Sequence, residues 1–254
     1  MTSYLPIPEP AAHDERGFTL VELTVVLLIV SLLVGGLLLP LSVQRDIQRL
    51  NETRRQMVDI REALLGFAAA HGRLPCPALS GARGVEDVDH ATGQCGNARA
   101  FLPAVTLGIA PVDAQGYALD GWGNRIRYAV TQYERSSERV FTHAGGIKRV
   151  WQDGSVPQPD LRICSTSAGI GDTDCAAGAE LASAAVAVVW STGGNDVSSG
   201  ADEQANATSR PNVRTFVSHA PTPADAPQGE FDDILIWLSP HVLYSRMITA
   251  GRLP

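Results

Sequence analysis

The stretch RGFTLVELTVVLLIVSLL, residues 16–33, is almost wholly apolar, and its single carboxylate, Glu22, lies near its start. The apolar run spans residues 18–39, which gives 22 residues and a helix about 33 Å long. It is too long for the core of an ordinary secretory signal, and no A-x-A-like site follows it. A retained membrane helix is therefore predicted. An acid costs about 2.5–3.5 kcal/mol at the bilayer centre, so Glu22 is expected to be functional unless it snorkels to the interface.

The helical pattern extends beyond the apolar run. Polar residues separate apolar ones spaced near 3.6 residues apart, and His71-Gly72 followed by Pro75 provides the stop signal. One helix is predicted over residues 18–70, half apolar all round and half amphipathic. The alternative is a break at Pro40 between a membrane anchor and a separate short helix. The periodic apolar residues are Ile47, Leu50, Met57, Val58, Leu64, Leu65 and Ala68.

Beyond residue 75, segments rich in Gly, Pro, Asp and Ser alternate with short apolar runs typical of strands. The expected fold class is α+β, with the amphipathic half of the long N-terminal helix packed on an antiparallel sheet. The long polar stretch 195–229 is interpreted as a surface loop. Strands are predicted at 125–131, 184–190 and 234–238, a weaker one at 140–144, and a closing helix at 241–250.

Composition excludes several classes. A net charge of −7 argues against nucleic acid as a partner. The chain has no G-x-S-x-G, H-E-x-x-H or P-loop motif, so an enzyme is not expected. The four cysteines form no CxxC pair, which argues against zinc. Their spacing suggests disulfides Cys76–Cys95 and Cys164–Cys175 in an oxidising compartment, the alternative being four free thiols.

The sequence GFTLVEL followed by an apolar helix resembles the prepilin-type cleavage and methylation motif of type IV pilins and type II secretion pseudopilins. The resemblance implies that a prepilin peptidase cuts between Gly17 and Phe18 and N-methylates Phe18. It also implies that Glu22 pairs with the Phe18 ammonium of a neighbouring subunit. Such a pair suits an intramembrane acid and would set the axial register of packed helices.

The resemblance also implies a domain organisation. Residues 1–17 would be the leader, 18–44 the transmembrane half of the helix, and 45–254 the amphipathic half plus a periplasmic globular head. The protein would lie in the inner membrane as a single-pass protein, or in an extracellular filament. The positive-inside rule opposes this orientation, but the motif and the cysteine pairs outweigh it. The opposing basic residues are Arg45, Arg49, Arg54 and Arg55.

Parts of the expected head resemble pseudopilins as well. The sequence DGWGNRIRYAV (120–130) is similar to their D-x-W-G…Y segment, and WSTGGND (190–196) and FDDILIW (231–237) are similar to the calcium loop and final strand of the major pseudopilin. The similarity implies calcium as the one candidate cofactor. Asn195 stands where that family usually has Asp, and the insert 197–229 is far larger. The alternative is a solvated acidic loop. The implied ligands are a carbonyl or side chain near Ser191 and Asn195 and the carboxylate of Asp233, with Asp196, Asp202, Glu203 and Asp232 as further oxygen donors.

The expected function is that of a structural subunit of a type IV pilus or type II secretion pseudopilus. Its partners would be the prepilin peptidase, other pilin or pseudopilin subunits and the inner-membrane assembly platform. A mature length of about 237 residues favours a minor subunit. The alternative is a pilin-anchored binding or adhesin head, in which the insert 197–229 recognises a substrate or surface.

Overall fold

The computed structural model describes residues 19–195, 200–208 and 210–254, except for the side chains of residues 35–43. The first element, α1, is a 52-residue helix from Leu20 to His71, and Pro40 lies inside its bounds. The helix ends at Gly72, whose φ of +70° suits a residue without a Cβ. The chain divides into two compact units, Met1–Ile47 and Gln48–Pro254, and the sheets belong to the second unit.

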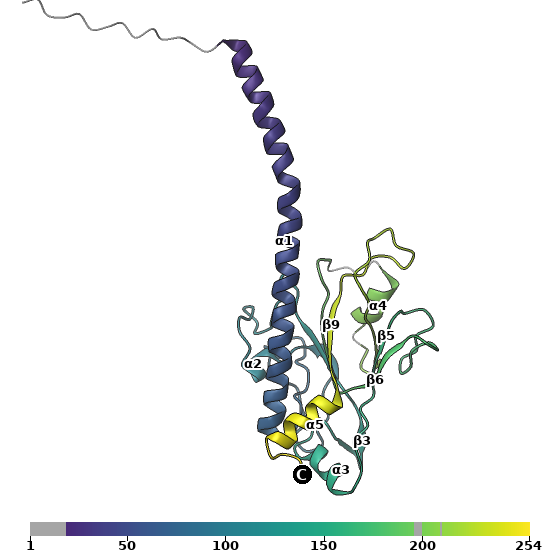
Figure 1. The fold of residues 1–254 in the computed structure, drawn as a ribbon. Helices are drawn as coiled ribbons and strands as arrows, with labels where there is room; N and C mark the ends of the chain where they lie inside the picture. The colour runs from purple at the N-terminus through teal and green to yellow at the C-terminus, as the bar shows by residue number, and fades with distance from the viewer. Residues whose placement is uncertain (1–18, 196–199, 209) are drawn as a thin grey trace, which may run out of the picture. The chain divides into compact units, whose positions relative to one another are not determined.

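The elements that follow α1 mix short helices and strands (Figure 1). The helices are α2 Ala104–Leu107, α3 Gly146–Gln152, α4 Ala201–Ala207 and α5 Pro240–Thr249. The strands are β1 Arg99–Phe101, β2 Arg127–Val130, β3 Glu134–Arg135, β4 Glu138–Arg139, β5 Leu161–Cys164, β6 Glu180–Ala185, β7 Ala187–Ser191, β8 Thr215–Val217 and β9 Ile234–Leu238.

The main sheet has four antiparallel strands in the order β1-β2-β7-β9. One face packs against the C-terminal part of α1 and against α5, which lies beside the end of α1 in Figure 1. Because side chains alternate along a strand, Tyr128 and Val130 point to this face and Ala129 to the other. The amphipathic stripe of α1 therefore forms the core that its 3.6-residue period predicts. Its buried members include Met57, Ile60, Leu64, Leu65 and Ala68.

A second, three-stranded sheet covers the opposite face of the main sheet. Its order is β6-β5-β8, with β5 antiparallel to β6 and parallel to β8. Trp190 of the main sheet packs edge-on against Phe216 of β8, with ring centroids 5.2 Å apart. With a layer on each side, every residue of β7 is buried, which explains its continuous apolar sequence.

Three expectations about local structure were wrong. The polar stretch 195–229 is not only a loop, because it contains α4 and β8. The run 140–144 is not a strand, since β4 precedes it and Val140 and Phe141 are buried in a turn. The run 184–190 is divided between β6 and β7, which lie in different sheets.

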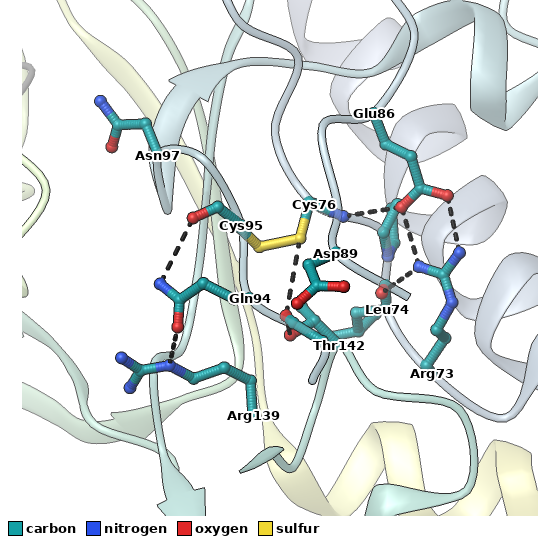
Figure 2. The surroundings of a disulfide bond; sticks show 12 residues. Arg73, Leu74, Cys76, Glu86, Asp89, Gln94, Cys95, Asn97, Arg139 and Thr142 are labelled. Carbon is teal, nitrogen blue, oxygen red and sulfur yellow. Dashed lines mark hydrogen bonds and ion pairs between the residues drawn. A yellow bond between two sulfur atoms is a disulfide. The ribbon is translucent and has the colours of Figure 1, made fainter. Parts of the chain in front are cut away.

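Two cysteine pairs lie at disulfide distance. The Cα atoms are 5.4 Å apart in Cys76–Cys95 and 5.5 Å apart in Cys164–Cys175, the pairs suggested by the spacing. Figure 2 shows the first pair beside a buried ion pair, in which Arg73 Nη1 and Nη2 donate to both oxygens of Glu86 at 2.8 and 2.6 Å. The backbone N–H of Cys76 also donates to Glu86, so the segment after α1 is fixed covalently and electrostatically.

The prediction that the apolar part of α1 spans a membrane is not confirmed by the described residues. In the part of the chain whose side chains are described, no helix is long and apolar enough to cross a membrane. Residues 18 and 35–39 of the predicted run lie outside that part. The transmembrane half therefore stays a prediction.

Candidate functional site

The acid of the N-terminal apolar run closes the first turn of α1. The backbone N–H and the Oγ1 hydroxyl of Thr19 both donate to Glu22 Oε2 at 3.0 Å. The Glu22 N–H donates back to Thr19 Oγ1 at 3.3 Å. This reciprocal pair is a capping box. The T-x-x-E spacing is its sequence signal, which the sequence analysis missed. Gly17 and Phe18 lie outside the described residues.

The remainder of this stretch offers an unburied apolar surface. The large apolar side chains of residues 20–34 are exposed, from 47% for Val30 to 79% for Leu20. A contiguous apolar surface of this kind marks a site that associates with lipid or with another protein.

The second candidate site is a cluster of three carboxylates in the second unit. Glu203 comes from α4, and Asp232 and Asp233 directly precede β9. One oxygen from each of the three lies within 4.8 Å of the others. Glu203 is only 2% exposed and Asp233 only 8%. Buried like charges at this separation repel unless a proton or a cation neutralises them.

Backbone and amide donors hold the cluster in place. Asn206 Nδ2 donates to Asp233 Oδ2 at 2.8 Å, and the Gly194 N–H donates to Asp232 Oδ2 at 2.7 Å. The Asp232 N–H in turn donates to Glu203 Oε1 at 2.9 Å. Asp232 Oδ1 is buried and has no hydrogen-bond partner among the described residues. That oxygen therefore has a free coordination position.

The pKa values of the two aspartates in the cluster are raised. Burial, reinforced by the neighbouring carboxylate of Glu203, raises the pKa of Asp233 to about 7. Burial also raises the pKa of Asp232 to about 6, against the opposing hydrogen bond from Gly194. Without a cation, Asp232 and Asp233 would hold protons at a pH where ordinary aspartates are ionised.

The loop after β7 approaches the cluster closely. Gly193 has φ +69°, and a Cβ at this position would collide with the Asp232 carboxylate. Gly193 C=O accepts a bond from Asn124 Nδ2 at 2.9 Å. The glycines of WSTGGND thus allow the backbone to contact the acidic residues, and a larger residue at 193 would separate them.

The expected ligands have different outcomes. Asp233 lies in the cluster together with Glu203 and Asp232. Asn195 touches its edge, since its Nδ2 lies 3.5 Å from Glu203 Oε1. Asp196 lies outside the described residues.

Two of the expected oxygen donors are used elsewhere. Asp202 Oδ2 lies 3.0 Å from His219 Nε2, and its Oδ1 accepts from the Ser167 N–H, so its inclusion among the ligands was wrong. The Ser191 hydroxyl donates to Asp120 Oδ2 at 2.5 Å, so its side chain also points elsewhere. Adjacent residues on α4 point in different directions, which explains why Glu203 reaches the cluster and Asp202 does not.

The DGWGN segment acts as a connector rather than a ligand. Asp120 Oδ1 accepts the N–H groups of Trp122 and Asn124 at 2.9 and 2.8 Å, which closes a tight turn. The Gly121 N–H donates to Thr53 Oγ1 of α1, and a Cβ on Gly121 would meet the α1 backbone. With the Ser191 contact, this turn links α1 to the loop beside the carboxylate cluster.

Arg99 is a buried cation that the sequence analysis missed. Its guanidinium donates to five backbone carbonyls, and the carboxylate of Asp233 favours its charge without a salt bridge between the two. It lies 3.8 Å from the ring centroid of Phe216 and 5.2 Å from that of Trp190. Burial lowers its pKa to about 9, so it stays charged at neutral pH. The accepting carbonyls belong to Ala205, Asn206, Thr208, Val213 and Thr215.

Comparison with known proteins identifies the N-terminal stretch. Residues 13–38 match the model of the prokaryotic N-terminal methylation motif, which is the type IV pilin and pseudopilin signature. No curated protein matches the chain, and no solved structure does. The match confirms the resemblance inferred from GFTLVEL.

Proposed function

We propose that this pilin-like chain, which has the N-terminal methylation motif, is a structural subunit of a type IV pilus or a type II secretion pseudopilus. The motif match at residues 13–38 is the observation that supports the proposal. Proteins with this motif are structural rather than enzymatic. In the proposal, the apolar part of α1 anchors the subunit in the inner membrane before assembly and packs against other subunits afterwards.

Processing is the first test. Intact-mass analysis of the full chain from its native host should show loss of residues 1–17 and one methyl group on Phe18. Gly17→Val should block cleavage because a branched side chain would not fit a cleft shaped for glycine, whereas Gly17→Ala should retain part of it. A mature terminus at any other residue would overturn the proposal.

The role of Glu22 needs a variant that separates charge from helix capping. Glu22→Gln keeps a side chain that accepts from Thr19 at the third helical position, but it removes the charge. If Glu22 pairs with a neighbour's amine, both Glu22→Gln and Glu22→Leu should insert and yet fail to assemble. Thr19→Val, which removes the hydroxyl but keeps the acid, should assemble. Assembly of Glu22→Gln at the wild-type level would refute the charge pair.

We also propose that Glu203, Asp232 and Asp233 bind a divalent cation, calcium in preference to magnesium. Three hard oxygen donors, one with an orphaned buried atom, fit calcium, which accepts irregular oxygen geometry. A bound cation would supply the positive charge that the cluster lacks. By binding one cation, Glu203 of α4 and the two aspartates before β9 would hold these two elements together. The three residues are brought together only in the folded chain, so cation binding would stabilise that state.

The second candidate, a binding head built on the insert 197–229, has weaker support. In the described part of that insert, Asn206 of α4 and Thr215, Phe216 and Val217 of β8 are buried. Asn206 bonds to both the N–H and the C=O of Val217, at 2.8 and 2.9 Å. These contacts favour a structural role for the described part of the insert. If a variant without residues 197–229 assembled normally but no longer attached to a surface, that result would support the binding head.

A further inference from the structure

The strand β9 is an open, apolar edge of the main sheet. It lies at the end of the order β1-β2-β7-β9 and pairs on one side with β7 through all five residues, ILIWL. Among the described residues, β9 has one backbone hydrogen bond outside this pairing. It comes from Val186, the residue before β7, whose N–H donates to Leu238 C=O. Trp237 is 37% exposed. An edge of this kind presents unpaired N–H and C=O groups and is a template for another strand.

The other edges of the two larger sheets are protected. At β1, Phe101 exchanges two backbone bonds with Ala78, at 2.9 and 3.1 Å, in the segment held by the first disulfide. At β8, the Asn206 amide bonds to both backbone groups of Val217. The strand β6 has Glu180 and pairs with β5 through two register shifts, and such charges and bulges discourage pairing. β9 has neither a charge nor a proline.

A cation with an unused donor lies beside this edge. Arg61 and Leu64 of α1 line a small cavity over the face of the sheet, together with Ala187 and Val189 of β7 and Ile236 and Trp237 of β9. Arg61 Nε is buried and finds no hydrogen-bond acceptor in the described part of the chain. A buried donor without an acceptor costs free energy, which an incoming acceptor would recover. A carboxylate provides the strongest match for a guanidinium.

We propose that β9 receives an extended strand from a neighbouring pilin-type subunit as a fifth strand of the main sheet, with a carboxylate of that strand beside Arg61. Backbone bonds would provide affinity, and the apolar faces of Ile236 and Trp237 would provide side-chain contacts. The choice of occupant rests on the proposed function, because the methylation motif implies assembly with other pilin-type subunits.

Hydrogen exchange on the full-length chain tests the inference. Exchange is measured on the chain dispersed in detergent and on the chain that co-sediments with filaments of its native host. Amides of Ile234–Leu238 should exchange at least about tenfold more slowly in the filament fraction. Trp237→Lys should reduce co-sedimentation about tenfold, because a lysine on the edge opposes strand addition. Leu181→Lys, on the protected edge β6, is the matched control and should co-sediment like wild type.

Arg61→Gln provides a second variant in case Trp237→Lys does not fold. It should weaken co-sedimentation while leaving the melting temperature unchanged. A chain that co-sediments normally with no added protection of β9 would overturn this inference and leave the proposed function standing. A chain that never co-sediments would overturn both. Protection that appears in detergent and rises with concentration would identify a second copy of this chain as the occupant, contrary to the proposal.

Discussion

Replacing Arg99 by methionine tests how the second sheet is attached to the first. The guanidinium extends from β1 and donates to Ala205 and Asn206 C=O at 3.0 Å, which are among the last carbonyls of α4. Helix ends leave such carbonyls without partners, so Arg99 provides the cap for α4 across more than 100 residues of sequence. Methionine would preserve the apolar stem and the contact with Phe216 while removing every donor.

The magnitude follows from the carbonyls that would lose their donors. Those of Ala205 and Thr208 belong to half-exposed residues and could be rehydrated. Val213 is buried, but its bond is long, at 3.5 Å, and contributes little. Asn206 and Thr215 are buried and accept at 3.0 and 2.9 Å. An unsatisfied buried polar group costs about 1–3 kcal/mol, so two of them give a loss of about 4 kcal/mol. For a unit of this size, that loss lowers the melting temperature by about 8–16 °C. Arg99→Lys should lie between, because one ammonium reaches fewer of the five acceptors.

The assay is thermal and urea unfolding of the full chain, combined with hydrogen exchange of α4. Arg162→Met is the matched control, since Arg162 forms a half-exposed ion pair with Glu180 at 2.5 Å and should cost less than about 1 kcal/mol. In Arg99→Met, α4 should lose protection before the main sheet unfolds. If Arg99→Met proved as stable as Arg162→Met, the capping role would be refuted.

Four further outcomes are expected. In chelator, the free energy of unfolding should fall as pH rises from about 4 to about 7, by up to about 4 kcal/mol for Asp233. The reason is that the pKa of Asp233 is raised in the folded state, so the folded chain binds a proton that the unfolded chain has already lost. Urea unfolding that gave the same free energy across this pH range would contradict the prediction. Millimolar calcium should remove that pH dependence and stabilise the chain by about 2.7 kcal/mol at a hundredfold excess over Kd, magnesium should do less, and Asp233→Asn should abolish the effect in a melting assay. Gly193→Ala should lower the melting temperature and weaken calcium binding, since its Cβ would collide with Asp232, and unchanged calorimetric binding would show that the loop can move aside. Non-reducing peptide mapping should recover the peptide pair linked by Cys164–Cys175, and loss of this disulfide alone should destabilise the chain by about 3 kcal/mol in the chain-entropy model.

Local patterns predicted the elements whose partners lie close in sequence or whose faces repeat regularly. The end of α1 at His71 follows from His71-Gly72, and the buried positions Met57, Leu64 and Ala68 follow the 3.6-residue period. The strands β2 and β9 and the closing helix α5 lie within about two residues of their predicted bounds. These features depend on backbone propensity and on burial of one face, both of which are written in a short window of sequence.

Long-range partners explain the failures. α4 has the sequence ADEQANA, and its buried residues Asp202, Glu203 and Asn206 are polar. A polar window of this kind is typical of a solvated loop, and nothing within it indicates that Arg99 caps it or that Asn206 pairs with β8. The same limit applies to the ligand set, because Asp202 and Glu203 are equivalent in the sequence and only the orientation of α4 distinguishes them.

By itself, the sequence predicted the N-terminal motif with its acid Glu22, the long helix and the pairing of nearby cysteines, because each follows from a local pattern or from residues within about 20 positions of one another. The tertiary structure alone decided that Glu203 meets Asp232 and Asp233, that Arg99 donates to the carbonyls of α4, and that β9 pairs on one side only among the described residues. The physical reason is that these contacts depend on which sheet faces stack and in which order the strands pair. That order is set by burial summed over the whole unit, which no local window contains.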